Sequence, residues 1–274
     1  MPRQGAAMPK FKLIAATALL AFTGLSQAAD SNDWELRIKN HGNSWTASFS
    51  GPTDYGPAGK RIKGSGVIVE KARALRPFSK LRLEGPMNVR LSQASSDAAR
   101  VSADDNIEPL IDTRVEDDTL ILRLLPGTGF STRYAPTVWV DSKNLQALVS
   151  SGSGDIAIDK FKSDKLSLSL NGSGDLRIGL LDVNELDAKL SGSGDCTVAG
   201  RAERQNWLLQ GSGDVDARSL NGSSAKAQLS GSGDLSLGVT QNLDATLQGS
   251  GDLSYAGRPV LKQNVSGSGE ISRR

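Results

Sequence analysis

Apolar and polar residues alternate along most of the second half of the chain. In the stretch "LDAKLSGSGDCTV", Leu186, Ala188 and Leu190 occupy every second position, and Cys196 and Val198 continue with the same parity. The alternation recurs at Leu166, Leu168, Leu170, Leu176 and Ile178, and again at Leu243, Ala245, Leu247, Leu253 and Tyr255. An apolar period of two is typical of β-strands that bury one face, so we predict strands on both sides of each "GSGD".

The four letters Gly-Ser-Gly-Asp return at a nearly fixed interval. The first Gly of each copy lies at 152, 172, 192, 211, 231, 249 and 267, and the last copy has Glu in place of Asp. Repeats of about 20 residues are typical of stacked supersecondary units. We therefore predict an all-β, parallel β-helix-like solenoid with coils of ~19 residues, in which like positions stack about 4.8 Å apart. A sandwich or barrel of hairpins, with Gly-Ser-Gly as the turn, is the alternative.

The parity can be followed through the motif itself. Gly192, Gly194 and Cys196 face one side, whereas Ser193 and Asp195 face the other. We expect the glycines at inward positions where the backbone passes close to another segment. The Ser and Asp side chains then point to solvent, where they can accept bonds from backbone N–H groups of their own coil. Cys196 takes an inward apolar position and is predicted to be a buried thiol.

The acids of the seven copies are predicted to form one row along the surface. The row consists of Asp155, Asp175, Asp195, Asp214, Asp234, Asp252 and Glu270. We interpret these residues mainly as turn formers, and the row is also the candidate binding surface. A phosphate-binding loop needs a Lys and a following helix, and a calcium-binding β-roll needs tandem nonapeptides. The sequence has neither, so we predict no metal, no cofactor and no catalytic residue in this row.

The first half of the chain carries weaker copies of the pattern. Residues 62–69 contain Gly-Ser-Gly, and residues 81–91 keep the parity, with Gly85 and with Asn88 at the Asp position. Alternation in 119–124 and 136–140 predicts two more strands in less regular coils. We expect residues 29–60 to form an N-terminal segment or cap and residues 61–274 to form one solenoid domain.

The first 28 residues have the pattern of a signal peptide. Lys10 and Lys12 precede an apolar stretch at 13–25, and the small residues Ser26 and Ala28 stand at the positions that a signal peptidase reads. The apolar stretch is short for a membrane span. Removing the three positive charges of residues 1–28 from the net charge of +2 leaves −1, which removes the electrostatic support for nucleic-acid binding. We expect cleavage after Ala28, no transmembrane anchor afterwards, and an exported protein in the periplasm or on the surface of a bacterium.

Three stretches together resemble a known family. "GSGVIVEKARALRPFSKLRLEGPMNVRL", "VEDDTLILRL" and the repeated "SGSGD" are similar to the family called putative auto-transporter adhesin, head GIN domain. The resemblance covers residues from Gly64 to the C-terminus. It implies a right-handed parallel β-helix-like fold in exported bacterial proteins, and its name implies adhesion. The resemblance brings no catalytic residues.

The sequence therefore favours a non-enzymatic, adhesin-like display protein that binds a glycan or an envelope protein. The alternative is a carbohydrate-active lyase or hydrolase with its site in residues 91–149, where Tyr134 and Trp139 would line a cleft with unlike acids. Glycoside cleavage requires a pair of carboxyl groups with different roles, which the near-identical repeats do not offer.

Overall fold

The computed structural model describes residues 35–41, 44–50, 53–55 and 61–274. The chain divides into two compact units, residues 1–52 and 53–274. In the first unit, β1 (Glu35–His41) and β2 (Ser44–Ser50) pair antiparallel, with Glu35 opposite Ser50. The predicted signal peptide, residues 1–28, lies outside the described residues, as do parts of the expected cap at 29–60.

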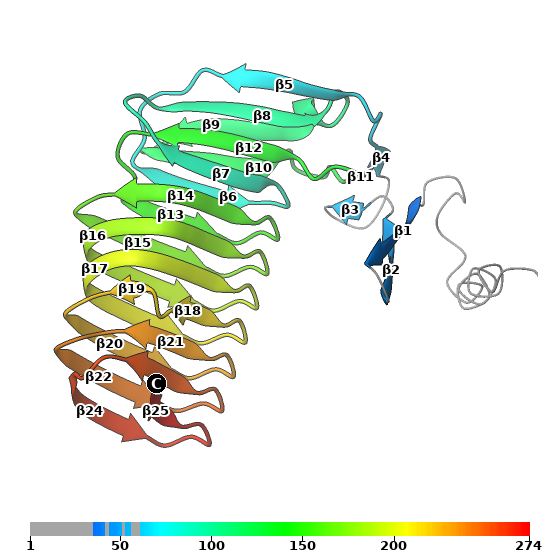
Figure 1. Cartoon of the computed structure of the whole chain (residues 1–274). Coiled ribbons are helices and arrows are strands. Elements are labelled where there is room, and N and C mark those ends of the chain that lie inside the picture. The colour runs from blue at the N-terminus through cyan, green and yellow to red at the C-terminus, as the bar shows by residue number, and fades with distance from the viewer. Residues whose placement is uncertain (1–34, 42–43, 51–52, 56–60) are drawn as a thin grey trace, which may run out of the picture. The chain divides into compact units, whose positions relative to one another are not determined.

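The second unit is a solenoid with two strands in each regular coil, one before and one after the motif (Figure 1). The strands before the motif form the first sheet, in the spatial order β9 (Ile111–Glu116), β10 (Thr119–Leu124), β6 (Lys80–Glu84), β13 (Ala147–Ser150), β15 (Lys165–Leu170), the second halves of β16 (Leu176–Leu190) and β17 (Cys196–Leu209), β20 (Ser224–Leu229), β22 (Asn242–Leu247) and β24 (Val260–Val265).

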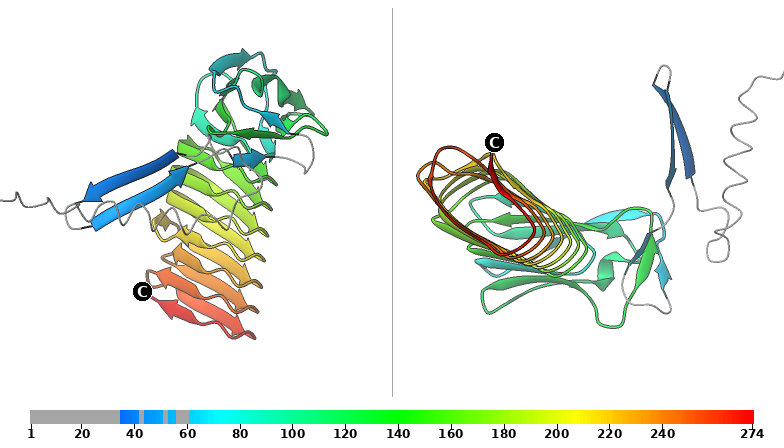
Figure 2. Two further views of the ribbon diagram at one scale, coloured as in Figure 1. Left: turned by 90° about the vertical axis from the view of Figure 1, so that its right-hand side faces the viewer. Right: turned by 90° about the horizontal axis from the view of Figure 1, so that it is seen from below.

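The strands after the motif form the second sheet. Its spatial order is β5 (Ile68–Arg73), β8 (Ala98–Asp104), β12 (Thr137–Ser142), β7 (Asn88–Gln93), β14 (Ile156–Lys162), the first halves of β16 and β17, β18 (Val215–Ala217), β21 (Leu235–Gly238), β23 (Leu253–Ala256) and β25 (Ile271–Arg273). The short β19 (Leu220–Asn221) pairs with the middle of β17. Seen from below in Figure 2, the repeat coils overlie one another as flattened loops.

The repeats pair in parallel and in register, which confirms the solenoid and excludes the hairpin alternative for this region. Equivalent apolar residues stack from coil to coil, because each parallel pairing joins positions 18 to 20 residues apart. One such row after the motif is Ile156, Leu176, Cys196, Val215, Leu235 and Leu253, and all six are buried. The alternation of the sequence thus becomes one continuous core between the two sheets.

The N-terminal end of the stack does not follow chain order. β6 and β7 are the first coil along the chain, yet they lie between β10 and β12 on one side and β13 and β14 on the other. Antiparallel strands β5, β8 and β9 end the two sheets, and the 3-10 helix η1 (Glu108–Leu110) connects β8 with β9. The strands expected at 119–124 and 136–140 are confirmed as β10 and β12.

Of the two weak copies of the motif predicted in the first half of the chain, the one at 62–69 does not form a coil corner and the one at 81–91 does. Gly64, Ser65 and Gly66 form no corner: β4 (Ile62–Lys63) pairs with β11 (Phe130–Thr132), which also pairs with β3 (Thr53–Tyr55). The Asp104 carboxylate accepts the Gly66 N–H at 2.6 Å, and Gly66 adopts a φ of 81°, so other contacts fix this loop.

The copy at 81–91 is a true corner. A Cβ at Gly152 would meet the backbone of Gly85, and Asn88 takes the place of the motif Asp. Among the described residues, no helix is both long and apolar enough to cross a membrane.

Candidate binding surface

The motif corner is held by close contact between the backbones of neighbouring coils. A Cβ at Gly192 would lie 1.8 Å from the carbonyl oxygen of Gly172, and one at Gly194 would lie 2.2 Å from that of Gly174. None of the motif glycines has a positive φ. The corner therefore requires Gly because the adjacent coil leaves no room for a side chain, rather than because of backbone conformation.

The parity predicted through the motif is confirmed. Ser193 and Asp195 are exposed, whereas Gly194 and Cys196 are buried. Burial raises the pKa of the Cys196 thiol to about 12, and the nearby Asp195 charge adds to the shift. The thiol is therefore protonated and inert at neutral pH.

The acids form a hydrogen-bonded ladder that runs between coils. In each step, the Oδ1 atom of one residue accepts the backbone N–H of the motif acid in the next coil. The successive acceptor–donor pairs are Asn88–Asp155, Asp155–Asp175, Asp175–Asp195, Asp195–Asp214, Asp214–Asp234, Asp234–Asp252 and Asp252–Glu270, at 2.8 to 3.0 Å. The expectation that each Asp supports its own coil is wrong, since each carboxylate binds the following coil.

The second oxygen of these carboxylates has no hydrogen-bond partner among the residues that the structure describes. Neighbouring acids repel each other by less than about 1 kcal/mol in water at this spacing. The bond to a backbone N–H offsets that cost. The result is a row of exposed carboxylate oxygens, and within the described part of the chain no group of three or more His, Cys, Asp or Glu could hold a metal ion.

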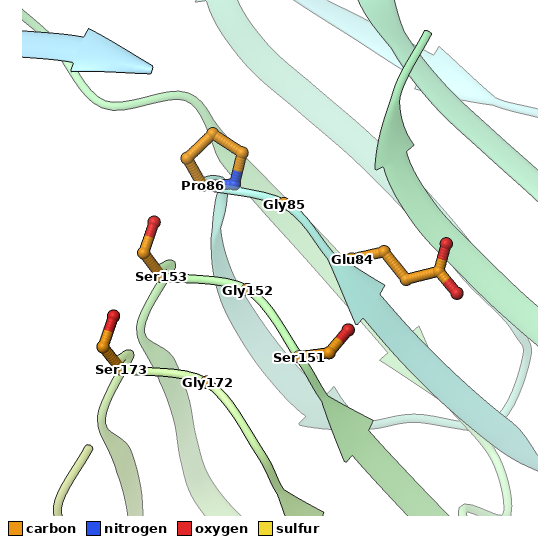
Figure 3. A pocket seen from close by; sticks show the side chains of 8 residues that line it. All are labelled: Glu84, Gly85, Pro86, Ser151, Gly152, Ser153, Gly172 and Ser173. Carbon is orange, nitrogen blue, oxygen red and sulfur yellow. The ribbon is translucent and has the colours of Figure 1, made fainter. Parts of the chain in front are cut away.

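A shallow, open depression of about 400 Å³ lies at the N-terminal end of the corner (Figure 3). Its lining includes Glu84, Pro86 and the serines of the first two repeats. In Figure 3 the hydroxyls of Ser153 and Ser173 point in the same direction, one above the other. The corner therefore presents Ser hydroxyls at regular intervals beside the row of Asp carboxylates.

The outer face of the first sheet carries a charged network that sequence reasoning missed. The Lys165 ammonium lies 2.5 Å from Glu185 and 2.7 Å from Asp187, and these two partners raise its pKa. Burial opposes ionisation of Asp187, but hydrogen bonds from Lys165 and Asn206 outweigh it and lower the pKa of that carboxyl. The residues are far apart in sequence and meet only because equivalent positions stack.

The residues of the expected enzymatic alternative lie on different elements. Tyr134 is 61% exposed between β11 and β12. Trp139 lies on β12, half-buried, with the Arg100 guanidinium 4.7 Å from its ring centroid. Arg100 on β8 was missed by sequence reasoning, because the antiparallel pairing of β8 with β12 is not encoded in the repeat.

The profile of the family described as "Putative auto-transporter adhesin, head GIN domain" matches residues 77–259, which is more than half of the chain. The chain belongs to this family. A crystal structure of a putative adhesin from Bacteroides fragilis is 25% identical, covers 78% of this chain and 100% of its own, and superimposes with a TM-score of 0.75.

Two further solved structures share the fold. A putative adhesin from Parabacteroides merdae is 22% identical, with 79% of this chain and 100% of the other covered and a TM-score of 0.64. A putative lipid binding protein from Parabacteroides distasonis is 24% identical, with 78% and 100% covered and a TM-score of 0.62. The comparison with curated proteins gives no match.

Proposed function

We propose that this GIN-domain protein is an exported, non-enzymatic, adhesin-like protein of the bacterial envelope. Its motif corner presents the row of Ser hydroxyls and Asp carboxylates to a glycan or to an envelope protein. The observation that carries the proposal is the ladder of Asp side chains, in which one oxygen is fixed by a backbone N–H and the other is left for a partner.

The corner is suited to binding because it is rigid before a ligand arrives. The serines are short, and the acids are fixed by hydrogen bonds to the backbone, so little side-chain entropy is lost on binding. Regular spacing along the stack favours a ligand that is itself extended or repeated, because many weak contacts then act together. The family and the Bacteroides relative support an adhesin-like role.

A binding role fits the corner better than catalysis does. Acid–base chemistry needs neighbouring groups with different protonation states, and the corner repeats the same residues. Incubation of the mature chain with candidate polysaccharides is expected to release no new reducing ends. Formation of cleavage products by the pure protein would overturn the non-enzymatic part of the proposal.

The binding role is tested by screening the mature chain against glycans and envelope proteins. For any partner found, the variant Ser173→Ala, Ser193→Ala, Ser212→Ala should weaken binding at least about tenfold, because three hydroxyls leave one exposed surface. The matched control is Ser167→Ala, Ser224→Ala, Thr246→Ala, which removes three hydroxyls from the outer face of the first sheet. Equal binding by both variants would contradict a role for the corner.

Export is tested separately. Mass spectrometry of the protein recovered from the periplasm or the cell surface should give an N-terminus at Ala29 or within one or two residues of it. Recovery of the chain only in the cytosol with Met1 or Met8 intact would contradict export.

A further inference from the structure

A row of large, positively charged and aromatic side chains crosses the outer face of the second sheet, away from the motif corner. Strand pairing places Arg100 of β8 beside Trp139 of β12, and Trp139 beside Arg90 of β7. Arg90 is next to Ala157 of β14, which is next to Arg177 of β16. These five residues are called the arginine row below, and Figure 1 shows their strands between the N-terminal end and the middle of the solenoid.

Trp139 is placed in a way that core packing does not explain. Trp207 is 3% exposed inside the solenoid, whereas Trp139 lies on the outer face and remains half-buried between its neighbours. The Arg100 guanidinium lies over the Trp139 ring, 4.7 Å from the ring centroid, and Glu70 lies 3.4 Å from Arg100. The exposed part of an aromatic side chain that a guanidinium holds in place is a preformed apolar contact for a ligand.

Arg90 and Arg177 carry charges that the protein does not neutralise. Both are exposed, and neither forms a hydrogen bond or an ion pair with another described residue. Asp141 and Asp159 lie on neighbouring strand positions of the same face but form no ion pair with them. Ala157 separates the two arginines with a short side chain, so a ligand group can approach both guanidinium groups from the same side.

The spacing of the charges points to a linear ligand. Arg100, Arg90 and Arg177 occupy every second strand, which separates their Cα atoms by about 10 Å along the stack. A guanidinium binds a carboxylate through two parallel hydrogen bonds, and the part of the indole that stays exposed beside Arg100 can pack against the C–H groups of a sugar ring. We infer that the arginine row binds a linear acidic polysaccharide, with its carboxylates on Arg90 and Arg177 and a sugar ring on Trp139.

The inference rests on the proposed function as a binding protein, but it assigns binding to a surface other than the motif corner. Titration calorimetry of the full-length mature chain at low salt uses hyaluronan as the acidic polysaccharide and dextran as the neutral one. Hyaluronan should bind and dextran should not, and affinity should fall as salt is raised from 50 to about 200 mM because exposed charges are screened. Equal binding of both polymers, or no binding of hyaluronan, would overturn the inference.

Substitutions locate the site. The double variant Arg90→Gln, Arg177→Gln should weaken hyaluronan binding at least about tenfold with an unchanged melting temperature, since both side chains are exposed and without partners. Arg82→Gln is the matched control, because Arg82 belongs to the same coil but lies on the outer face of the first sheet; it should bind within about twofold of the parent. Trp139→Ala should also weaken hyaluronan binding. If Trp139→Ala fails to fold, the double variant Arg90→Gln, Arg177→Gln still tests the site.

Two other outcomes separate this inference from the proposed function. If Asp195→Asn, Asp214→Asn abolishes hyaluronan binding and the arginine double variant does not, the corner is the site and the inference fails while the proposed function stands. If anionic phospholipid vesicles compete with hyaluronan and bind more tightly through Arg90 and Arg177, the ligand is a membrane surface and the polysaccharide assignment is wrong.

Discussion

Gly192 and Gly194 let neighbouring coils stack closely because they have no side chain. An added Cβ would lie 1.8 Å from the Gly172 carbonyl oxygen in the first case and 2.2 Å from the Gly174 oxygen in the second. The clash is with backbone, which cannot rotate away as a side chain can, so the coils would have to separate. The cost belongs to the stacking of coils, and not to the filling of the core.

The first prediction follows from this contact. Gly192→Ala should lower the free energy of unfolding by about 3 kcal/mol or more, because even a methyl group overpacks the contact. Ser193→Ala, one residue away and exposed, is the control and should change stability by less than about 0.5 kcal/mol. Urea unfolding followed by circular dichroism measures both. A larger loss in the Ser193 variant would show that the facing of the motif is wrong.

The Asp ladder gives a second prediction at the residue scale. Asp195→Asn keeps an oxygen that can accept the Asp214 N–H and removes repulsion from two neighbours, so it should cost less than about 1 kcal/mol. Asp195→Ala loses the acceptor and should cost more than the Asn variant. Glu270→Ala is the control, since no described residue donates to the Glu270 side chain, and it should be nearly neutral.

Thermal melts with and without calcium test the other role of the ladder. A ligand that binds only the folded state raises the melting temperature by mass action. A tight calcium site needs six to eight oxygens that converge on one point, and the carboxylates of a straight row do not converge. Calcium is therefore expected to change the melting temperature little. A rise of many degrees that disappears in Asp195→Asn, Asp214→Asn would make the row a cation site.

At the scale of elements, a buried carboxylate fastens the N-terminal end of the stack. Glu108 of η1 is 1% exposed and forms ion pairs with Lys71 and Arg73 of β5, the former at 2.7 Å. Burial opposes its ionisation, but the hydrogen bonds and charges of Lys71 and Arg73 outweigh that effect and lower the pKa of Glu108. Edge strand β5 is thereby fixed to η1 and to the core beneath it.

The third prediction concerns this contact. Glu108→Gln should lower stability at pH 7 by about 2 kcal/mol, because two cations lose their buried counter-charge. A carboxyl whose folded pKa is lowered stabilises the fold above its unfolded pKa of 4.5, and this stabilisation is lost as the pH falls through the folded pKa. The difference between parent and variant should therefore shrink below pH 4.5. Glu116→Gln, with an exposed side chain, is the control, and a pH-independent difference would contradict the ion-pair role.

The alternation of apolar residues was sufficient to predict most strands and the facing of the motif. The period of two fixes which side chains point inward, as at Leu190 and Cys196, and equal spacing makes them stack. The partner of each Asp could not be predicted in this way, because parity gives a direction but does not choose between the N–H groups of the same and the next coil.

The order of the coils at the N-terminal end could not be predicted from the sequence either. After β7 the chain does not go on to the coil that lies next to it on the C-terminal side. It first forms β10 and β12, which pair with β6 and β7 on their N-terminal side. Alternation carries no information about which coil a strand joins. Gly64-Ser65-Gly66 was misassigned because three letters were matched without the Asp that follows the second Gly of a true corner; Val67 stands there instead. Arg90 and Arg100 join Trp139 only through these pairings.

At the scale of the whole molecule, the regular coils act as interchangeable layers. Each contacts its two neighbours through the same ladder of backbone bonds, the same glycine contact and the same rows of apolar residues. In such a quasi-one-dimensional stack, stability is close to a sum over units and their interfaces. One complete coil is therefore removable if the register on both sides is restored.

The fourth prediction is that deletion of residues 152–171 yields a folded, shorter solenoid. The deletion joins Ser151 to Gly172, which brings Gly172 onto Gly85 and leaves Asn88 to accept the Asp175 N–H, because each pair occupies the same position one coil apart. Strand-type circular dichroism and one cooperative melt at a modestly lower temperature are expected, since one interface is lost. Deletion of 152–161 is the matched control. It preserves the alternation of inward and outward residues but removes the corner and all of β14 except Lys162, so β15 would have to enter the wrong sheet. If the half-coil deletion folded as well as the full-coil deletion, hydrophobic alternation alone would hold the molecule together, and the corner would not be what sets its register.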